Sequence, residues 1–432
     1  MGIREGKIEV IDNYPGSGNA EYSSFTPGES KQVQLTIGVM EMQADMRKII
    51  TEFNRSQDYI QIKPVAYVEG TDYDAGYEKL KLDVVQGKAP DLISTYGIDY
   101  ESLVNKGVFV NLYEYMEADP ECNKEMFVPS VLKAYETEGC LYTVAPSFLI
   151  HTMWGRSSLL QGRHGVDMNE LIQILKENGG DINNIYGFSA DESVLRTLCS
   201  LGMSQFINWG DGTCDFANDE FYQILEFAKE YRGTSFESLY LATRENEILL
   251  TLGLITSVED YCLESELYGE DVDFVGYPTT EGTGTVASFL GDALAVNAKS
   301  GYLQEAWKFI KYYLLHGYDG SGFPIMQDQF EEVLLASIEE IWVEEDGQFA
   351  RVAKKSYTER DVVSIQIYKA EQKDVDAVKQ LVEQVTGKFQ YYNAIQNIID
   401  EEAEYYFSGH KNLQVVAEVI QNRVRLYLQE SR

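Results

Sequence analysis

The sequence predicts an α/β protein of two domains, built on parallel β-sheet. The chain has 432 residues, which is longer than a single hydrophobic core ordinarily serves, so two domains are the default expectation. Strand-like and helix-like patterns alternate over residues 33–95, and the same alternation returns over 254–314. Alternation of this kind favours parallel strands joined by right-handed crossovers.

The first strand is expected at 33–39, where apolar residues alternate. A helix follows, because four apolar residues recur at spacings of three and four: Met46, Ile49, Ile50 and Phe53. A short strand at 59–63 should stop at Pro64. The second helix carries Tyr77, Leu80 and Val84, with Gly87 placed to cap it, and a third strand is expected at 91–95.

The later part of the chain repeats these patterns. Strands are expected at 254–256, 272–275 and 293–296, the first running into a helix near Glu259 and the last preceding a helix at 303–314. The last 70 residues are expected to be wholly helical, with two apolar stripes: Val375, Val378, Val382 and Val385, then Val416, Ile420, Val424 and Tyr427. Residues 1–31, rich in Gly, Ser, Pro, Asn and Glu, are expected to form a loose leader or linker.

The charge balance excludes several classes of partner. Seventy Asp and Glu against 35 Lys and Arg give a net charge of −35. Nucleic acids require basic surfaces, so we expect no nucleic-acid partner, and an anionic membrane surface would repel the chain. No run of 18 apolar residues occurs. The five cysteines form no C-x-x-C pair, and we expect buried free thiols.

Motifs for cofactors and catalysis are missing from the sequence. It contains no P-loop, no G-x-G-x-x-G that opens a helix after a strand, no G-x-S-x-G and no H-E-x-x-H. The four histidines, His151, His164, His316 and His410, are far apart. We therefore expect no cofactor, no metal site and no catalytic residues.

Five ordered segments, and a sixth near the carboxyl terminus, resemble the family 1 extracellular solute-binding proteins, the sugar-type substrate-binding components of bacterial ABC importers. They are 53–55 (FNR) with the strand at 60–62, 86–93 (QGKAPDLI), 106–112 (KGVFVNL), 139–146 (GCLYTVAP), 306–312 (AWKFIKY) and 402–409 (EAEYYFSG). The leader lies outside the resemblance. The chain departs from many sugar binders after its first strand, where Met40 to Gln43 replace the usual aromatic residue.

The resemblance implies a two-lobed periplasmic-binding-protein-like fold, with parallel-sheet lobes joined by a hinge and a helical C-terminal region. Lobe one would hold 32–145 and 278–325, and lobe two 146–277 and 326–432. It implies a monomer that captures a carbohydrate between the lobes, delivers it to a membrane ABC permease and catalyses nothing. We expect an extracellular lipoprotein anchored through a segment upstream of residue 1, since residues 1–6 resemble neither a signal peptide nor a myristoylation site.

Candidate ligand-binding residues follow the strands, because ligands of open α/β sheets bind beyond the carboxyl ends of the strands. In lobe one, Glu41 and Gln43 follow the first strand, and Tyr96 and Asp99 follow the third. The structural alternatives are a polar helix start for the first pair, a loop tyrosine for Tyr96 and a helix N-cap for Asp99.

Further candidates lie at the crossovers and in lobe two. They are Ser147, Phe148, His151 and Trp154 after Pro146; Glu259, Asp260 and Tyr261 after the strand that ends near Thr256; and Phe289 and Asp292 in the return to lobe one. Trp154 and Tyr261 are expected to be rings on which a sugar stacks, with a core position as the alternative for both.

Two other functions remain open at this stage. A glycoside-active enzyme would use a pair of acids among Asp99, Glu101, Glu259, Asp260 and Asp292, which fall near predicted strand ends. A binder of peptides or of another small polar solute would use the same cleft, as would a chemosensory version of the fold.

Overall fold

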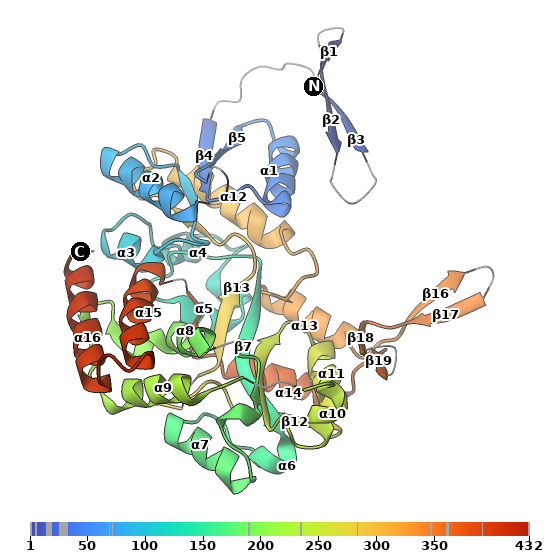
Figure 1. Cartoon of the computed structure of the whole chain (residues 1–432). Helices are drawn as coiled ribbons and strands as arrows, with labels where there is room; N and C mark the ends of the chain where they lie inside the picture. The colour runs from blue at the N-terminus through green and yellow to red at the C-terminus, as the bar shows by residue number, and fades with distance from the viewer. Residues whose placement is uncertain are drawn as a thin grey trace.

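The computed structural model shows a mixed α/β protein built around two sheets (Figure 1). It describes residues 2–4, 7–13, 20–25 and 33–430, except for 69, 71, 189–190, 234–235, 283, 346–347, 360–362 and 391. Side chains are described from residue 33 onward, apart from those at the exceptions and at 191–193 and 345.

The smaller sheet has the strand order β14-β6-β4-β5. Its three parallel strands are β4 (Val33–Val39), β5 (Ile60–Ala66) and β6 (Leu92–Ser94), and β14 (Leu294–Val296) is antiparallel to β6. The helices that follow or cover these strands are α1 (Ala44–Ser56), α2 (Tyr73–Gln86), α3 (Tyr100–Asn105), α4 (Tyr113–Ala118), α5 (Pro129–Tyr135) and α12 (Leu303–His316), with a short 3₁₀ turn η1 (Lys124–Met126). The predicted strand–helix alternation of residues 33–95 is confirmed.

The helix faces predicted for this sheet are also confirmed. The four apolar residues of α1 are all buried, and each such side chain contributes about 1.5–3 kcal/mol when fully removed from water. Gly87 caps α2 with φ of 68°, a left-handed conformation that favours glycine. Pro64 does not end its strand, because β5 continues to Ala66. β5 is the edge strand of this sheet. Proline, which has no N–H to donate, is tolerated in edge strands because one side of the strand has no hydrogen-bonded neighbour.

The larger sheet is mixed rather than parallel. Its order is β20-β13-β7-β11-β8, and β12 and β15 also pair with β7. The long central strand β7 (Ser147–Arg156) is antiparallel to four neighbours, and parallel pairing is found for β11 with β8 and for β13 with β20. The other strands are β8 (Ile185–Tyr186), β11 (Leu250–Ile255), β12 (Val272–Phe274), β13 (Val286–Phe289), β15 (Phe323–Pro324) and β20 (Gly387–Lys388).

Helices surround this sheet, and the end of the chain contributes three of them. They are α6 (Ser157–Leu160), α7 (Met168–Glu177), α8 (Asp191–Gly202), α9 (Asp219–Glu230), α10 (Leu239–Arg244), α11 (Val258–Tyr268), α13 (Gln327–Ala336), α14 (Gln372–Glu383), α15 (Asn393–Phe407) and α16 (Leu413–Glu430), with 3₁₀ turns η2 (Ile182–Asn184) and η3 (Met203–Gln205). Figure 1 shows α15 and α16 side by side in red, next to α8 and α9.

The C-terminal region is not wholly helical, because two of its segments are extended. β19 (Val363–Ile367) pairs with β18 (Lys355–Glu359), and β20 lies between α14 and α15. Two further hairpins are formed by β9 (Ile207–Asn208) with β10 (Thr213–Cys214), and by β16 (Ile341–Glu345) with β17 (Gln348–Val352). Figure 1 shows β16 and β17 projecting from the body.

Among the described residues, three segments cross between the two sheets: 144–147, 290–294 and the stretch from the end of α12 to Ile325. Residues 144–147 run beside 290–294, with backbone hydrogen bonds in both directions between Val144 and Leu294, and the carbonyl of Pro146 accepts from the N–H of Ile325. β13 and β15, both inside the range 278–325 that the sequence places with the smaller sheet, pair with β7 in the larger one. The chain therefore returns to the smaller sheet only after Phe289.

The predicted leader contains three strands among its described residues. β1 (Gly2–Arg4), β2 (Lys7–Asn13) and β3 (Ala20–Phe25) form an antiparallel sheet. The expectation of a loose segment overlooked the alternation of apolar and polar residues at 7–10, which is typical of a strand. Residues 1, 5–6, 14–19 and 26–31 of the predicted leader lie outside the described residues.

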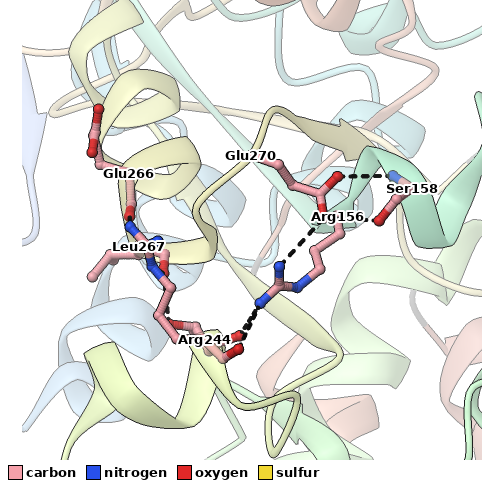
Figure 2. A network of polar contacts seen from close by, with 7 residues as sticks. Arg156, Ser158, Arg244, Glu266, Leu267 and Glu270 are labelled. Atoms are coloured by element: carbon pink, nitrogen blue, oxygen red, sulfur yellow. Dashed lines mark hydrogen bonds and ion pairs between the residues drawn. The ribbon is translucent and has the colours of Figure 1, made fainter.

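Two arginines connect the carboxyl end of β7, in the larger sheet, to the ends of two neighbouring helices (Figure 2). The guanidinium of Arg156, on β7, donates to the carbonyls of Thr243 and Arg244 at the end of α10 and pairs with Glu270 at 3.3 Å. Arg244 in turn donates to the carbonyls of Glu266 and Leu267 at the end of α11. Cations at these helix ends satisfy carbonyls that have no partner within the helix and interact favourably with the helix dipole.

Within the described part of the chain, every helix is too short or too polar to cross a membrane. All five cysteines are free thiols, and Cys122, Cys199 and Cys262 are buried.

Candidate functional site

A cavity of about 620 Å³ lies between the two sheets. Its walls come from α1 and the loop after β6 on one side, and from β7, β11 and β13 on the other. The crossing segments and the end of α12 complete it. This volume lies within the range of about 300–1,000 Å³ that is typical of small-molecule sites.

The smaller sheet contributes residues that follow the carboxyl ends of its parallel strands. Gln43 precedes α1 after β4, and Thr95 and Tyr96 follow β6. The Thr95 hydroxyl lies 2.9 Å from that of Thr143, and the Thr95 N–H donates to the carbonyl of Ala293 over 2.7 Å. The loop after β6 is thus held against two crossing segments, which places it at the edge of the cavity.

β7 presents every second side chain to the cavity. Ser147, Leu149 and His151 line it, as the alternation of side chains along a strand requires. The Nε2 atom of His151 lies 2.9 Å from the hydroxyl of Ser288, and its ring stacks on Phe389 with 4.8 Å between centroids. Burial lowers the pKa of His151 to about 4, so this imidazole is neutral at physiological pH.

A pair of stacked rings forms another part of the wall. The rings of Tyr135, from α5, and Phe289, at the end of β13, lie 3.8 Å apart at an interplanar angle of 21°. The N–H of Phe289 donates to the phenol oxygen of Tyr135 over 2.9 Å. Tyr135 is buried and Phe289 is half-buried. The phenylalanine is therefore fixed from behind by a buried ring and by its own backbone.

Asp292 is a buried carboxyl group in the wall of the cavity. It is 6% exposed, and its Oδ1 accepts a 2.5 Å hydrogen bond from the hydroxyl of Ser94, at the end of β6. Burial raises the pKa of Asp292, and the bond from Ser94 opposes that shift. The Tyr313 hydroxyl donates to the backbone carbonyl of Asp292 over 2.8 Å. These bonds fix a hydrogen-bond acceptor where a crossing segment meets both sheets.

The structure brings six of the thirteen predicted site residues together in this cavity. They are Gln43, Tyr96, Ser147, His151, Phe289 and Asp292. The other seven lie outside its lining: Glu41, Asp99, Phe148, Trp154, Glu259, Asp260 and Tyr261.

Phe148 and Trp154 point away from the cavity because they occupy the even positions of β7. Both belong to the core on the opposite face of the strand, where Phe148 is fully buried and Trp154 is 3% exposed. The Trp154 indole donates to Glu264 Oε2 over 2.9 Å and packs over Gly253, where an added Cβ would lie 2.9 Å from its ring. Its geometry is that of a core residue.

Asp260 and its neighbours serve the start of α11. Oδ2 of Asp260 accepts from the backbone and hydroxyl of Thr256, each over 2.7 Å, in a capping arrangement with Ser257. Its Oδ1 pairs with Lys355 at 2.5 Å, and Glu259 faces Lys354 at 3.8 Å.

Tyr261 likewise lies in the core, 4% exposed and 5.8 Å from the ring of Phe274.

The last two residues outside the lining, Glu41 and Asp99, also have partners within the protein. The carboxylate of Glu41 accepts from the Tyr73 hydroxyl over 2.9 Å. Asp99 precedes α3, and its carboxyl group accepts from the hydroxyl of Tyr427 on α16. Burial raises the pKa of Asp99, and the bond from Tyr427 opposes the shift.

Sequence reasoning missed several residues of the lining. Tyr135 precedes the crossover, Leu254 pairs with His151 across β11, and Phe389 and Gln390 follow β20. The strand β20 lies in a region expected to be helical, so no sequence signal pointed to Phe389. Leu254 was recoverable, since a strand next to β7 must place alternate residues on the cavity face.

Among the described side chains, no group of three or more His, Cys, Asp or Glu is arranged to hold a metal ion.

The overall fold is similar to that of several solved proteins. The sugar-binding protein MalE from Xanthomonas citri is 13% identical, with 92% of this chain and 98% of that chain covered and a TM-score of 0.56. A periplasmic oligogalacturonide-binding protein from Yersinia enterocolitica is 15% identical, with 92% and 99% covered and a TM-score of 0.56. The substrate-binding protein Lmo0181 from Listeria monocytogenes, solved with cycloalternan, is 12% identical, with 92% and 100% covered and a TM-score of 0.51.

No curated protein matches the chain in sequence. These similarities in structure show the two-lobed binding-protein fold. The family model described as bacterial extracellular solute-binding protein matches residues 48–316, which is more than half of the chain. With its ligand-sized cavity between two sheets, the chain therefore belongs to the bacterial extracellular solute-binding proteins.

Proposed function

We propose that this protein captures a carbohydrate in the cavity between its two sheets and delivers it, chemically unchanged, to a membrane ABC permease. The observation that carries the proposal is the composition of the cavity, in which fixed aromatic rings lie beside short polar side chains. Three solved proteins with this fold bind a sugar or an oligosaccharide, and this supports a ligand of the same class.

The aromatic wall suits the apolar faces of sugar rings. Phe289 is the proposed platform, because Tyr135 and the backbone of β13 fix it, and Tyr96 is 44% exposed at the edge of the cavity. A fixed ring offers its face with little loss of side-chain entropy. Ring stacking contributes about 0.5–1.5 kcal/mol beyond the area buried.

The polar wall suits sugar hydroxyls. Gln43, Thr95, Ser147 and Asp292 line the cavity, together with Gln390 after β20. Hydroxyl, amide and carboxylate groups accept hydrogen bonds from ligand hydroxyls, and a buried polar group that is left unpaired penalises the wrong ligand. We propose these five residues, together with Tyr96, His151 and Phe289, as the ligand-binding set.

The contact between His151 and Ser288 resembles a nucleophile–base pair, but its electrostatics argue against turnover. A general base works best with a pKa near the operating pH, whereas burial lowers the pKa of His151 to about 4. Among the described hydrogen bonds, none joins this ring to a carboxylate that would orient it. These observations support a binder without catalysis.

The organisation of the molecule suggests how capture would proceed. We propose that the smaller and larger sheets are the cores of the two lobes, that the three crossing segments form the hinge, and that closure buries the ligand. We further propose a monomer held outside the cell by a lipid anchor, as the family and the proposed delivery to a permease suggest.

A glycan-binding screen tests the proposal. The intact protein should bind at least one oligosaccharide of a neutral and acidic panel in calorimetry, and long incubation should release no product. Steady product release would show that the protein is an enzyme. Binding of peptides in place of glycans would show that its ligand belongs to another class.

Phe289→Ala tests the location of the site. Losing the platform should weaken binding of the ligand found in the screen about tenfold, because about 1.4 kcal/mol is a factor of ten. Phe349→Ala is the matched control, since Phe349 is 72% exposed on β17 and lies outside the cavity. Equal affinities of the two variants would place the ligand elsewhere.

A further inference from the structure

Acidic side chains outnumber basic ones in the lining of the cavity. Four carboxyl groups line it, and among the charged lining residues that the structure describes, one Lys and no Arg oppose them. The acids are Asp45 and Glu52 from α1, Asp292 in a crossing segment and Asp319 after α12, and the cation is Lys48.

Among the described residues, these four acids have no ion-pair partner. Because burial raises the pKa of Asp292, the main negative charges are those of Asp45, Glu52 and Asp319. Asp292 accepts from the Ser94 hydroxyl and Asp319 accepts from the N–H of Ser321, both uncharged donors. The chain as a whole carries −35, so distant charges add to the same sign. A cleft with an excess of one sign of charge, here four acids against Lys48, focuses the field within it.

Such a cavity repels an anionic ligand. A carboxylate that enters it loses part of its water and meets Asp45 and Asp319, which are exposed, and Glu52, which is half-buried. The repulsion therefore acts partly through solvent and depends on ionic strength. Carboxylate recognition ordinarily uses the paired N–H donors of arginine, which the described lining lacks. Uncharged hydroxyls, by contrast, donate to carboxylates through charge-assisted bonds of above-average strength.

We propose that the cavity selects glycans by charge, and that its ligand is an oligosaccharide without carboxylate groups. This inference rests on the proposed function, since it specifies the ligand class of the same cavity. The similar fold of the Yersinia oligogalacturonide-binding protein, whose ligand is a polyanion, makes the distinction concrete. The same two-lobed fold would serve either class, with the charges in the cavity deciding between them.

The test is a calorimetric comparison of matched glycans on the intact protein. Galacto-oligosaccharides are compared with oligogalacturonides, and gluco- and xylo-oligosaccharides with counterparts that carry glucuronic acid. We expect the uncharged glycans to be the ones that bind well. Each should bind at least about tenfold more tightly than its acidic counterpart. An acidic glycan that binds as tightly as its neutral counterpart would overturn the charge selection and leave the proposed carbohydrate binding intact. Failure of all glycans of both classes would instead refute the proposed function itself.

Removing acids should relax the selection. In the double variant Asp45→Asn/Asp319→Asn, the ratio of neutral to acidic affinity should fall at least about threefold, because two repulsive charges are lost. The control Asp328→Asn/Glu332→Gln removes two exposed acids of α13, outside the lining, and changes the net charge equally.

Ionic strength gives an independent readout. Raising it from about 0.01 M to about 1 M shortens the screening length from about 30 Å to about 3 Å, so the ratio should fall for the wild type as well. A ratio that neither the cavity variant nor salt changes would show that shape, rather than charge, rejects the acidic glycans.

Discussion

Trp154 illustrates how a single side chain is committed to the core. Its indole N–H is bound by Glu264, its ring contacts the edge of Phe274, and Gly253 leaves space for it on the neighbouring strand. A ring held in this way contributes to stability and has no face toward the cavity. Phe289 has the opposite environment, because it lines the cavity and is half-buried.

Trp154→Ala should therefore lower stability and leave binding intact. Removing a buried indole costs about 3–5 kcal/mol, which chemical denaturation of the variant measures. Titration of the folded protein at low temperature should return the wild-type affinity for the ligand found in the screen. If the variant melted normally but bound weakly, Trp154 would instead be a ring on which the sugar stacks.

Glu264 links stability to pH. Burial raises its pKa from 4.5 to about 7, with Asp260 adding to the shift and the bond from Trp154 and the charge of Lys355 opposing it. Between these two pH values the folded protein holds a proton that the unfolded chain has released. This contribution to stability is therefore present below about pH 4.5 and is lost as the pH rises through about 7.

Glu264→Gln should remove that pH dependence. The amide oxygen can still accept from Trp154, and no charge has to be buried at high pH. The variant should match the wild type near pH 4 and exceed it by about 1–3 kcal/mol at pH 8, measured by urea unfolding at both values. A difference that stays constant with pH would assign the titration to another group.

At the scale of residues, sequence patterns located the cavity edge but not the direction of side chains. Ser147 and His151 were predicted together with Phe148 and Trp154, although a strand must send these two pairs to opposite faces. Treating the segment after Pro146 as a strand separates them. The capping role of Asp260 is local, but its pairing with Lys355 and that of Asp99 with Tyr427 involve distant residues that no local pattern reveals.

The short helix α3 connects elements that are distant in the sequence. Its Glu101 is 2% exposed and pairs at 2.6 Å with Lys388 of β20, which is 11% exposed. Asn105 donates to the carbonyl of Trp209 over 3.3 Å, and Asp99, just before the helix, meets Tyr427 of α16. The helices of the smaller sheet and the C-terminal region are thus held together through α3.

Lys388→Met should be strongly destabilising, because it leaves the Glu101 carboxylate buried without its partner. Breaking one side of a buried pair costs about 3–5 kcal/mol, whereas replacing both sides is often close to neutral. The double variant Lys388→Met/Glu101→Met should therefore recover most of the lost free energy of unfolding. Lys379→Met, which removes a 3.7 Å exposed pair with Glu331, is the control and should change stability by at most about 1 kcal/mol. Equal losses in the single and double variants would show that the pair is not coupled.

At the scale of elements, the sequence predicted helices and strands well where one face is buried against a core. The stripe of α1 is an example, and all four of its apolar residues are buried. The hairpin β16–β17 was missed because it is exposed, so burial imposes no apolar periodicity on it. In β19, by contrast, apolar and polar residues alternate as in a strand, and the expectation of a wholly helical end overlooked this pattern. β20 was missed because a strand of two residues is defined by its partner β13 alone.

For the whole molecule, the position of the cavity means that a bound ligand can contact both halves of the protein. Its walls include α1 and the end of β6 on one side and β7, β11 and β13 on the other. A ligand that touches both walls stabilises the folded state by mass action, by about 2.7 kcal/mol at a free concentration of 100 times Kd. Because a chain of this size need not unfold in a single step, calorimetry can resolve the two halves.

We therefore expect saturating ligand to raise the calorimetric transition that first unfolds a wall of the cavity. If the free protein melts in two transitions, the lower one should move upward toward the upper one, because opening either wall releases the ligand and the second half then unfolds without it. In Phe289→Ala the upward shifts should shrink at the same ligand concentration, because the affinity is lower. Phe349→Ala should behave like the wild type. A ligand that raises only the upper transition and leaves the lower one unchanged would be bound by a single half, and capture by closure of two lobes would then be excluded.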